Sequence, residues 1–159
     1  MKLPIYIISD NHFLLDKDQL EEKRRAKLFK LFQNIKNTGG TLILGGDFFD
    51  FWIEFRFGYP TVYDDILNEL EKLHNHNIEI HYVLGNHDYW DFGLFKQKFG
   101  CHVHKKELKF SINNKNIVVI HGDGLLKNDY LYRIMRIIIR NYFVMFMIRS
   151  IPVKLGCWI

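Results

Sequence analysis

The stretch of sequence that decides the fold is TLILGGDFFD, residues 41–50. Its first half, residues 41–45, is a continuous apolar run that includes a β-branched residue, as expected for a short strand buried in a sheet. Its second half passes through Gly46 into Asp47 and Asp50. Because ligands of open α/β sheets bind beyond the carboxyl ends of strands, this abrupt change from apolar to acidic residues indicates a binding site.

The same pattern occurs at three other places in the chain. Apolar runs at 3–9, 78–84 and 116–120 are each followed at once by a polar cluster, namely Ser9-Asp10-Asn11-His12, Gly85-Asn86-His87-Asp88 and His121-Gly122-Asp123-Gly124. The intervals are 37 residues (10 to 47), 39 residues (47 to 86) and 35 residues (86 to 121), about one strand–helix–strand unit each. We therefore expect one crevice to be surrounded by Asp10, His12, Asp47, Asn86 and His121.

Helical patterns separate the strands. Residues 18–37 and 61–76 carry apolar side chains at helical spacing, and residues 129–148 also resemble a helix. Asp18 followed by Glu21 predicts a capping box at the start of the first helix. Residues 107–120 predict a hairpin, and residues 3–9 a buried strand. The alternation of strands and helices over 159 residues predicts a single α/β domain with a partly parallel sheet.

The clustered residue types suit divalent metal ions. Carboxylate, amide oxygen and imidazole ligands together favour Mn, Fe or Zn over Ca, which prefers oxygen ligands alone. A bridging carboxylate could hold two ions about 3.5–4 Å apart, as in two-metal phosphoester hydrolysis. The simpler interpretation is that Asp or Asn after a strand only caps a turn. Four such clusters in register make that interpretation weaker than it is for any one of them.

Three motifs together resemble the signature of calcineurin-like metallophosphoesterases: Asp10-x-His12, Gly46-Asp47-x-x-Asp50 and Gly85-Asn86-His87-Asp88. The resemblance implies a sandwich of two sheets flanked by helices, with two metals at the sheet ends. It implies that one metal is bound by Asp10 and His12, the other by Asn86 and His121, and that Asp47 bridges them. Asp50 would support the ligands, and His87 would act as a general acid or contact the scissile phosphate.

From His121 onward, the sequence resembles more narrowly the bacterial UDP-2,3-diacylglucosamine diphosphatases of lipid A synthesis. This resemblance rests on His121-Gly122-Asp123, Asp129, Tyr132, Arg136, Arg140-Asn141 and Pro152-x2-Leu155-Gly156. It implies hydrolysis of the pyrophosphate to lipid X and UMP, with two divalent ions, for which we expect Mn²⁺, with Fe or Zn as alternatives. It also places Asp129, Tyr132 and Arg136 near the substrate, in a helical insertion that takes the acyl chains.

The last metal motif of that family, Gly-His-x-His, is absent from the 159 residues. The resemblance therefore leads us to expect a sandwich whose C-terminal part is missing, with residues 1–126 as the core and 127–159 as the start of the insertion. A truncated product with little catalysis is one alternative. A phosphatase or phosphodiesterase acting on soluble phosphoesters is another. His102 and His104 are an alternative source of metal ligands, although a surface strand is the simpler interpretation.

The charge is unevenly distributed. Residues 1–126 hold 16 Lys and Arg against 17 Asp and Glu, and residues 127–159 hold six against one, so the excess positive charge lies in the last segment. This argues against a nucleic-acid partner. Arg133, Arg136 and Arg140 share one face of an otherwise apolar helix, which favours an anionic membrane or a lipid-linked phosphate over a core helix. The chain has two cysteines and lacks both a signal peptide and a membrane span, which predicts a cytoplasmic protein peripheral to the inner face of the membrane.

Overall fold

A four-stranded parallel sheet forms the centre of the computed structural model, which describes residues 1–125 and 130–157. Its strands stand in the order β1-β2-β3-β4. They are β1 (Ile5–Ile8), β2 (Thr41–Leu44), β3 (Glu79–Val83) and β4 (His102–His104). Ile8 pairs with Leu44, and Leu44 with Tyr82, so the carboxyl ends of the first three strands lie level with one another. The predicted α/β class is confirmed.

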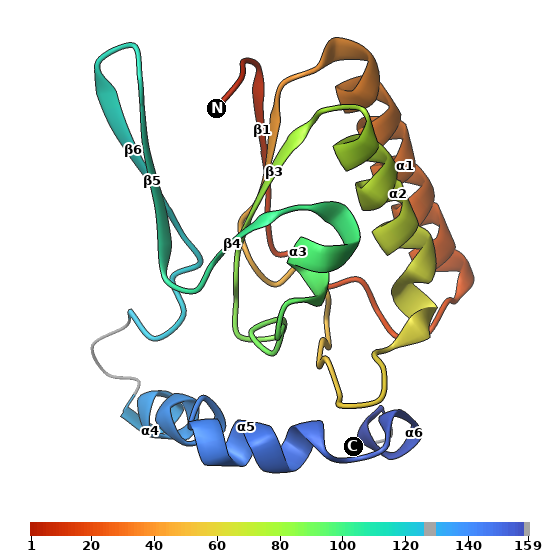
Figure 1. Ribbon diagram of the computed structural model, residues 1–159, viewed down its shortest axis with the longest axis vertical. Coiled ribbons are helices and arrows are strands. Elements are labelled where there is room, and N and C mark those ends of the chain that lie inside the picture. Colours follow the sequence, from red (N-terminus) through yellow and green to blue (C-terminus); the bar gives the residue numbers. More distant parts are fainter. Residues whose placement is uncertain (126–129, 158–159) are drawn as a thin grey trace.

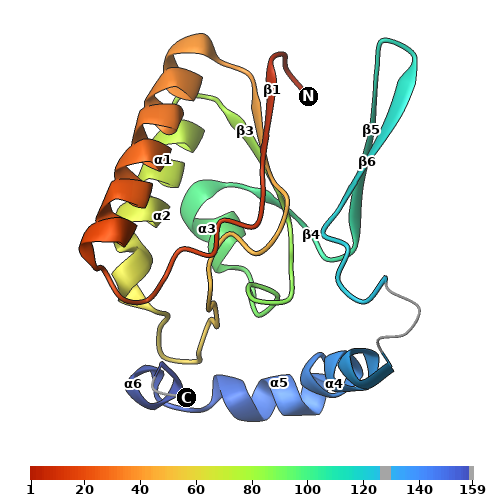
Figure 2. The same cartoon turned by 180° about the vertical axis from the view of Figure 1, so that it is seen from behind.

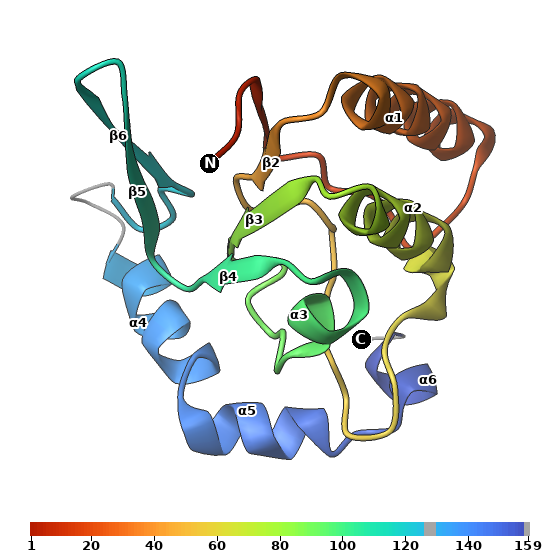
Figure 3. The same ribbon diagram turned by 45° about the horizontal axis from the view of Figure 1, so that its top comes forward.

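Three helices and one 3₁₀ turn cover one face of this sheet (Figures 1 and 3). They are α1 (Gln19–Thr38), η1 (Thr61–Tyr63), α2 (Asp64–Asn75) and α3 (Leu94–Phe99). Apolar residues at helical spacing, such as Leu28 and Phe32 of α1, are buried against the sheet. Only half of the predicted capping box forms. The Asp18 carboxylate accepts the Glu21 N–H at 2.7 Å, but the Glu21 carboxylate accepts the Leu14 N–H and pairs with Arg25 instead.

The opposite face of the sheet carries the predicted hairpin, β5 (Glu107–Ile112) and β6 (Lys115–Ile120), which Figure 2 shows from behind. Leu108 packs on Ile43 and Val83, and these three residues form a small second core. The strand predicted at residues 3–9 forms, but the prediction that it is buried is wrong. β1 lies at the edge of the sheet, and Ile7 is 52% exposed because the hairpin covers only part of that face.

The last described segment, 130–157, forms a helical layer across the end of the sheet (Figure 1). It consists of α4 (Tyr130–Ile139), α5 (Tyr142–Arg149) and α6 (Val153–Gly156). The predicted helix at 129–148 is therefore two helices. The helix is interrupted before Tyr142, where the Asn141 side chain accepts the Phe143 N–H and caps α5. No residue of α4 is buried in this chain, so α4 takes no part in the core that the described residues form.

The helical layer contacts the core through arginine side chains, through Gly156 packed on the buried Phe55 ring and through a backbone hydrogen bond from Arg56 N–H to the Arg149 carbonyl at 2.8 Å. The Arg140 guanidinium lies 4.0 Å from the centre of the Tyr89 ring. The Arg149 guanidinium lies 4.3 Å from the Phe92 ring centre and 3.3 Å from the Glu54 carboxylate. Within the described ranges, the helices are all too short or too polar to cross a membrane.

Candidate metal centre

Hydrogen bonds between the loops after β1 and β2 bring the first predicted ligands together. Past the strand ends, the Asp10 and His12 N–H groups donate to the carbonyls of Gly46 and Asp47, each at 2.9 Å. Asp10, His12 and Asp47 all have positive φ, between 45° and 52°, which is uncommon for residues other than glycine. The parallel pairing thus continues into the loops and holds these side chains in an unusual backbone conformation.

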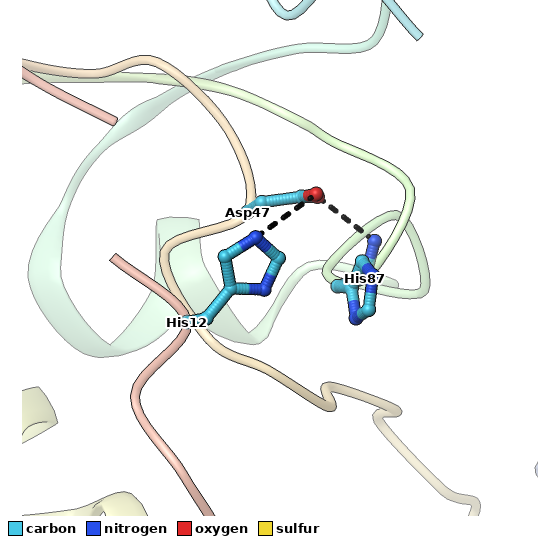
Figure 4. A group of neighbouring side chains, drawn as sticks. All are labelled: His12, Asp47 and His87. Atoms are coloured by element: carbon cyan, nitrogen blue, oxygen red, sulfur yellow. Dashed lines mark hydrogen bonds and ion pairs between the residues drawn. The ribbon is translucent and has the colours of Figure 1, made fainter. Parts of the chain in front are cut away.

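One group of possible metal ligands consists of His12, Asp47 and His87 (Figure 4). Their ligand atoms lie within 4.8 Å of one another. His12 Nε2 is 3.6 Å from Asp47 Oδ2, and the His87 backbone N–H donates to Asp47 Oδ1 at 3.0 Å. Asp47 itself is only 4% exposed. The three side chains therefore converge on one point from three different strand ends.

A second group, within the same 4.8 Å limit, consists of Asp10, Asp47 and His121. His121 Nε2 lies 3.2 Å from Asp47 Oδ2 and 3.2 Å from the amide oxygen of Asn86. The structure thus brings together all five residues predicted as ligands, and Asp47 is common to both groups. Asp10 is grouped with His121 here, whereas the resemblance pairs it with His12. Their roles as ligands remain a prediction.

Asp47 and His121 stabilise each other's charged forms. Burial acts to raise the pKa of Asp47, but hydrogen bonds from His121 and the His87 backbone outweigh it, and the pKa lies below its usual value. The hydrogen bond to Asp47 raises the pKa of His121, against its desolvation. The cluster therefore favours an ionised carboxylate and a positive charge beside it. The donor set of imidazole nitrogens with carboxylate and amide oxygens suits Mn, Fe or Zn.

Asp50 supports the two histidines that face solvent. Its carboxylate lies 3.3 Å from His12 Nδ1, and its backbone carbonyl lies 2.6 Å from His87 Nδ1. The His12 and His87 rings meet edge to face at 4.7 Å. Hydrogen bonds to the second ring nitrogen orient histidines that bind metals or substrates. The His87 side chain is 39% exposed, so part of the imidazole faces solvent.

Asp88 is a buried carboxylate that the sequence interpretation missed. It is fully buried and accepts hydrogen bonds from Phe48 N–H at 2.8 Å, Gly85 N–H at 2.7 Å and Tyr82 O–H at 2.5 Å. Phe48 follows Asp47 and Gly85 precedes Asn86, so Asp88 fixes the backbone beside two candidate ligands. Its place three residues after Gly85, in a turn, is the sequence signal that could have identified it.

Two of the three predicted substrate residues, Tyr132 and Arg136, contact Asp123, which lies two residues after His121. Asp129 lies outside the described residues. Tyr132 O–H and Arg136 Nη1 both reach Asp123 Oδ2, at 3.2 and 3.1 Å, and Arg140 Nη2 reaches it at 2.9 Å. Asp123, two residues after His121, therefore binds polar side chains on the inner face of the helical layer. It was not among the predicted site residues, although it belongs to the His121 cluster.

His102 and His104 lie away from both groups. They form the edge strand β4, where His104 Nε2 lies 3.0 Å from Nδ1 of the buried His81. Among the residues that the structure describes, neither group of possible metal ligands includes them. The structure thus gives no support to His102 and His104 as substitute ligands, and the surface-strand interpretation fits their place in the sheet.

Two groups of imidazole and carboxylate side chains that could hold metal ions thus share the buried Asp47, at the end of the parallel sheet where ligands of open α/β folds bind. The model of the calcineurin-like phosphoesterase family matches residues 3–148, and the chain belongs to that family. The family resemblance drawn from the strand-end motifs is confirmed.

Curated relatives carry the name UDP-2,3-diacylglucosamine hydrolase. One from Porphyromonas gingivalis is 29% identical over 143 residues, which make up 86% of this chain and 54% of that protein. Another from Pseudomonas fluorescens strain SBW25 is 30% identical over 154 residues, or 94% of this chain and 58% of that protein. The chain therefore spans just over half the length of the curated relatives it matches.

Proposed function

We propose that the protein carrying this chain hydrolyses the pyrophosphate of a UDP-2,3-diacylglucosamine-type substrate, giving 2,3-diacylglucosamine 1-phosphate (lipid X) and UMP in lipid A biosynthesis. The observation that carries the proposal is the pair of metal-ligand groups that share Asp47. The names of the curated relatives support the choice of substrate. In the reaction, a water oxygen bonds to the phosphorus of the UMP half, and the bridging oxygen leaves with the sugar phosphate.

Two divalent cations, Mn²⁺ in our proposal, fit the donor set described above. Asp10, His12, Asn86 and His121 would hold them, with Asp47 between the two. When bound, such cations lower the pKa of water and neutralise charge that develops on phosphate oxygens. The buried Asp88 and the carboxylate of Asp50 would keep the ligands in place.

His87 is the proposed catalytic side chain. Its Nδ1–H donates to the Asp50 carbonyl at 2.6 Å, which fixes the ring and leaves Nε2 directed to substrate. Nε2 would hold a proton for the bridging oxygen as the phosphorus–oxygen bond breaks. This assignment follows from the position of His87 at the edge of the first ligand group, next to the Asp47 carboxylate.

We propose that residues 127–159 begin a helical insertion that contacts the lipid half of the substrate. The arginines of the helical layer face the core, while large apolar side chains on its other side are exposed. Leu131 is 83% exposed and Ile137 71% exposed. The apolar outer surface fits acyl chains, and the net positive charge of the whole segment favours an anionic membrane. Tyr132 and Arg136, gathered at Asp123, would contact the sugar phosphate together with Asp129.

The test of the reaction is release of UMP from UDP-2,3-diacylglucosamine with Mn²⁺ present. We expect turnover that is lost in Asp10→Ala and after chelation of the metal. A control assay with a small chromogenic phosphodiester separates chemistry from substrate choice. Turnover of the small ester without release of UMP would reject the lipid nucleotide and favour the soluble-phosphoester alternative.

The membrane proposal is tested by flotation with vesicles that contain anionic lipid. We expect Leu131→Glu to weaken vesicle binding about tenfold or more, since burial of one leucine contributes about 1.5–3 kcal/mol. Leu20→Glu is the matched control, because Leu20 is 67% exposed and belongs to α1, which is not part of the helical layer. An equal loss of vesicle binding in the two variants would reject α4 as the membrane-facing surface. It would also reject peripheral attachment to the inner face of the cytoplasmic membrane through this helix.

A further inference from the structure

A pocket of about 200 Å³ opens beside His87. Two loops line it, residues 50–53 and 86–90. These loops are joined by backbone hydrogen bonds on both sides of the pocket, from Trp52 N–H to the His87 carbonyl and from Glu54 N–H to the Trp90 carbonyl, both at 2.9 Å. The walls are therefore formed before any ligand binds.

The pocket combines aromatic and apolar walls with a polar rim. Phe51, Ile53 and Trp90 supply the apolar part, and Trp90 is only 6% exposed. Asp50 and His87 stand among the polar lining residues. Aromatic walls favour stacking of a flat ring, and the Asp50 carboxylate disfavours an anionic group while accepting a hydrogen bond from a ring N–H. A neutral heteroaromatic ring fits this chemistry, whereas a phosphate does not.

The size of the pocket limits its occupant. Sites for drug-sized ligands measure about 300–1,000 Å³, so a volume of about 200 Å³ suits a single ring better than a diacylated sugar. A larger pocket of about 360 Å³ lies between Val62 and Val153, but none of its lining residues belongs to the ligand groups. Only the smaller of these two pockets is therefore continuous with the candidate metal centre.

The position of the pocket separates the two halves of the proposed substrate. Asn86 and His87 line the pocket and also belong to the candidate metal centre. On the His121 side of the centre lie Asp123 and the arginines of the helical layer, next to its exposed apolar surface. A pyrophosphate held at the centre could thus extend its lipid half past His121 and its nucleotide half past His87.

We infer that the pocket between residues 50–53 and 86–90 is the subsite for the pyrimidine base of the nucleotide half. This inference rests on the proposed function for the identity of the nucleotide. It assigns Phe51 and Trp90 to base stacking, and it makes the pocket a determinant of substrate specificity that the metal ligands themselves do not provide.

The test compares binding of UMP and ribose 5-phosphate to the Mn²⁺-loaded chain, because the two share ribose and phosphate and differ in the base. Stacking on an aromatic residue contributes about 1–3 kcal/mol per base, so we expect UMP to bind about tenfold more tightly. Phe51→Ala should bring UMP to the affinity of ribose 5-phosphate. Phe57→Ala is the matched control, since Phe57 is 80% exposed and outside the pocket, and it should keep the preference.

Tryptophan fluorescence gives a second readout. UMP should quench Trp90, and Trp90→Phe should bind UMP with the same preference while losing most of the quenching. Equal affinity for UMP and ribose 5-phosphate, or an equal loss of both in Phe51→Ala, overturns the subsite. A retained base preference without hydrolysis of the lipid nucleotide supports the subsite and rejects the proposed reaction. Hydrolysis without a base preference rejects the subsite alone.

Discussion

Asp88→Asn tests whether a buried carboxylate outside the candidate ligands controls the metal centre. Asp88 Oδ2 accepts Phe48 N–H and Tyr82 O–H, and Oδ1 accepts Gly85 N–H. An amide can keep only one acceptor oxygen, so its NH₂ group must face a backbone N–H. Tyr82 can rotate to accept from the amide, but one buried backbone donor loses its partner.

The expected loss of stability in Asp88→Asn follows from the number of hydrogen bonds that the amide cannot make. An unpaired buried donor costs about 1–3 kcal/mol, and loss of charge-assisted hydrogen bonds adds about 1 kcal/mol. Burial raises the pKa of Asp88, so the neutral amide recovers part of the desolvation cost of the carboxylate. We therefore expect the free energy of unfolding to fall by about 2–4 kcal/mol. Tyr82→Phe, which removes one donor and leaves the carboxylate, should cost only about 1 kcal/mol.

The metal centre should respond as well. Because Phe48 and Gly85 adjoin Asp47 and Asn86, movement of either backbone displaces a candidate ligand. Loss of such an outer partner typically weakens metal binding about 10–100-fold. Urea denaturation gives the stability, and titration calorimetry with Mn²⁺ gives the affinity. A stability loss below about 1 kcal/mol would refute the hydrogen-bond count. Unchanged Mn²⁺ affinity in a destabilised variant would show that Asp88 supports the fold alone.

Three further predictions concern other parts of the structure. Asp47→Ala should lose both metals, because both groups need its carboxylate; two bound ions per chain, measured by elemental analysis, would reject the bridging role. Gly46→Ala should impair His121, because a Cβ there would lie 2.6 Å from Nδ1, and cost about 1–3 kcal/mol in urea unfolding; Gly39→Ala, also at positive φ but with open space around it, is the control. Burial raises the pKa of Asp91 to about 6, so the folded state holds this proton more tightly than the unfolded state, whose pKa is about 3.9. Stability from Asp91 is thus greatest below about pH 4 and falls by up to about 3 kcal/mol as the pH rises through 6. Asp91→Asn should remove that slope, and a variant with the same pH profile of urea unfolding as the parent chain would contradict the assignment.

The predictions from sequence succeeded where a short local pattern dictates the structure. A strand followed by glycine and a carboxylate needs no tertiary information, and the residues after β1, β2 and β3 meet because parallel strands place their carboxyl ends at one edge. His121 reaches the same place from the antiparallel hairpin, which the spacing alone does not predict. The interpretation failed where partners come from elsewhere in the chain. Asp88 resembles a turn residue until Phe48 and Tyr82 are known to donate to it. The burial of β1 depends on what covers its face, which the apolar run does not encode.

The helical segment shows the same limit. Its apolar periodicity predicts a helix over 129–148, yet the pattern does not say which face is turned inward. Asn141, a good N-cap residue, was the available sign that the helix would break. The inward direction of Arg136 and Arg140 is set by Asp123, a single carboxylate 13 and 17 residues away. Only the folded chain reveals that pairing.

The arginine-based attachment of the helical layer has a consequence for how it responds to ionic strength. Arg136, Arg140 and Arg149 contribute ion pairs with partly exposed guanidinium groups, and added salt screens such pairs much more than it affects apolar burial. The parallel sheet, held by buried apolar side chains, has no such sensitivity. High salt should therefore weaken the attachment of this layer while the sheet stays folded, so that amide protons of α4 and α5 exchange with solvent faster than those of α1.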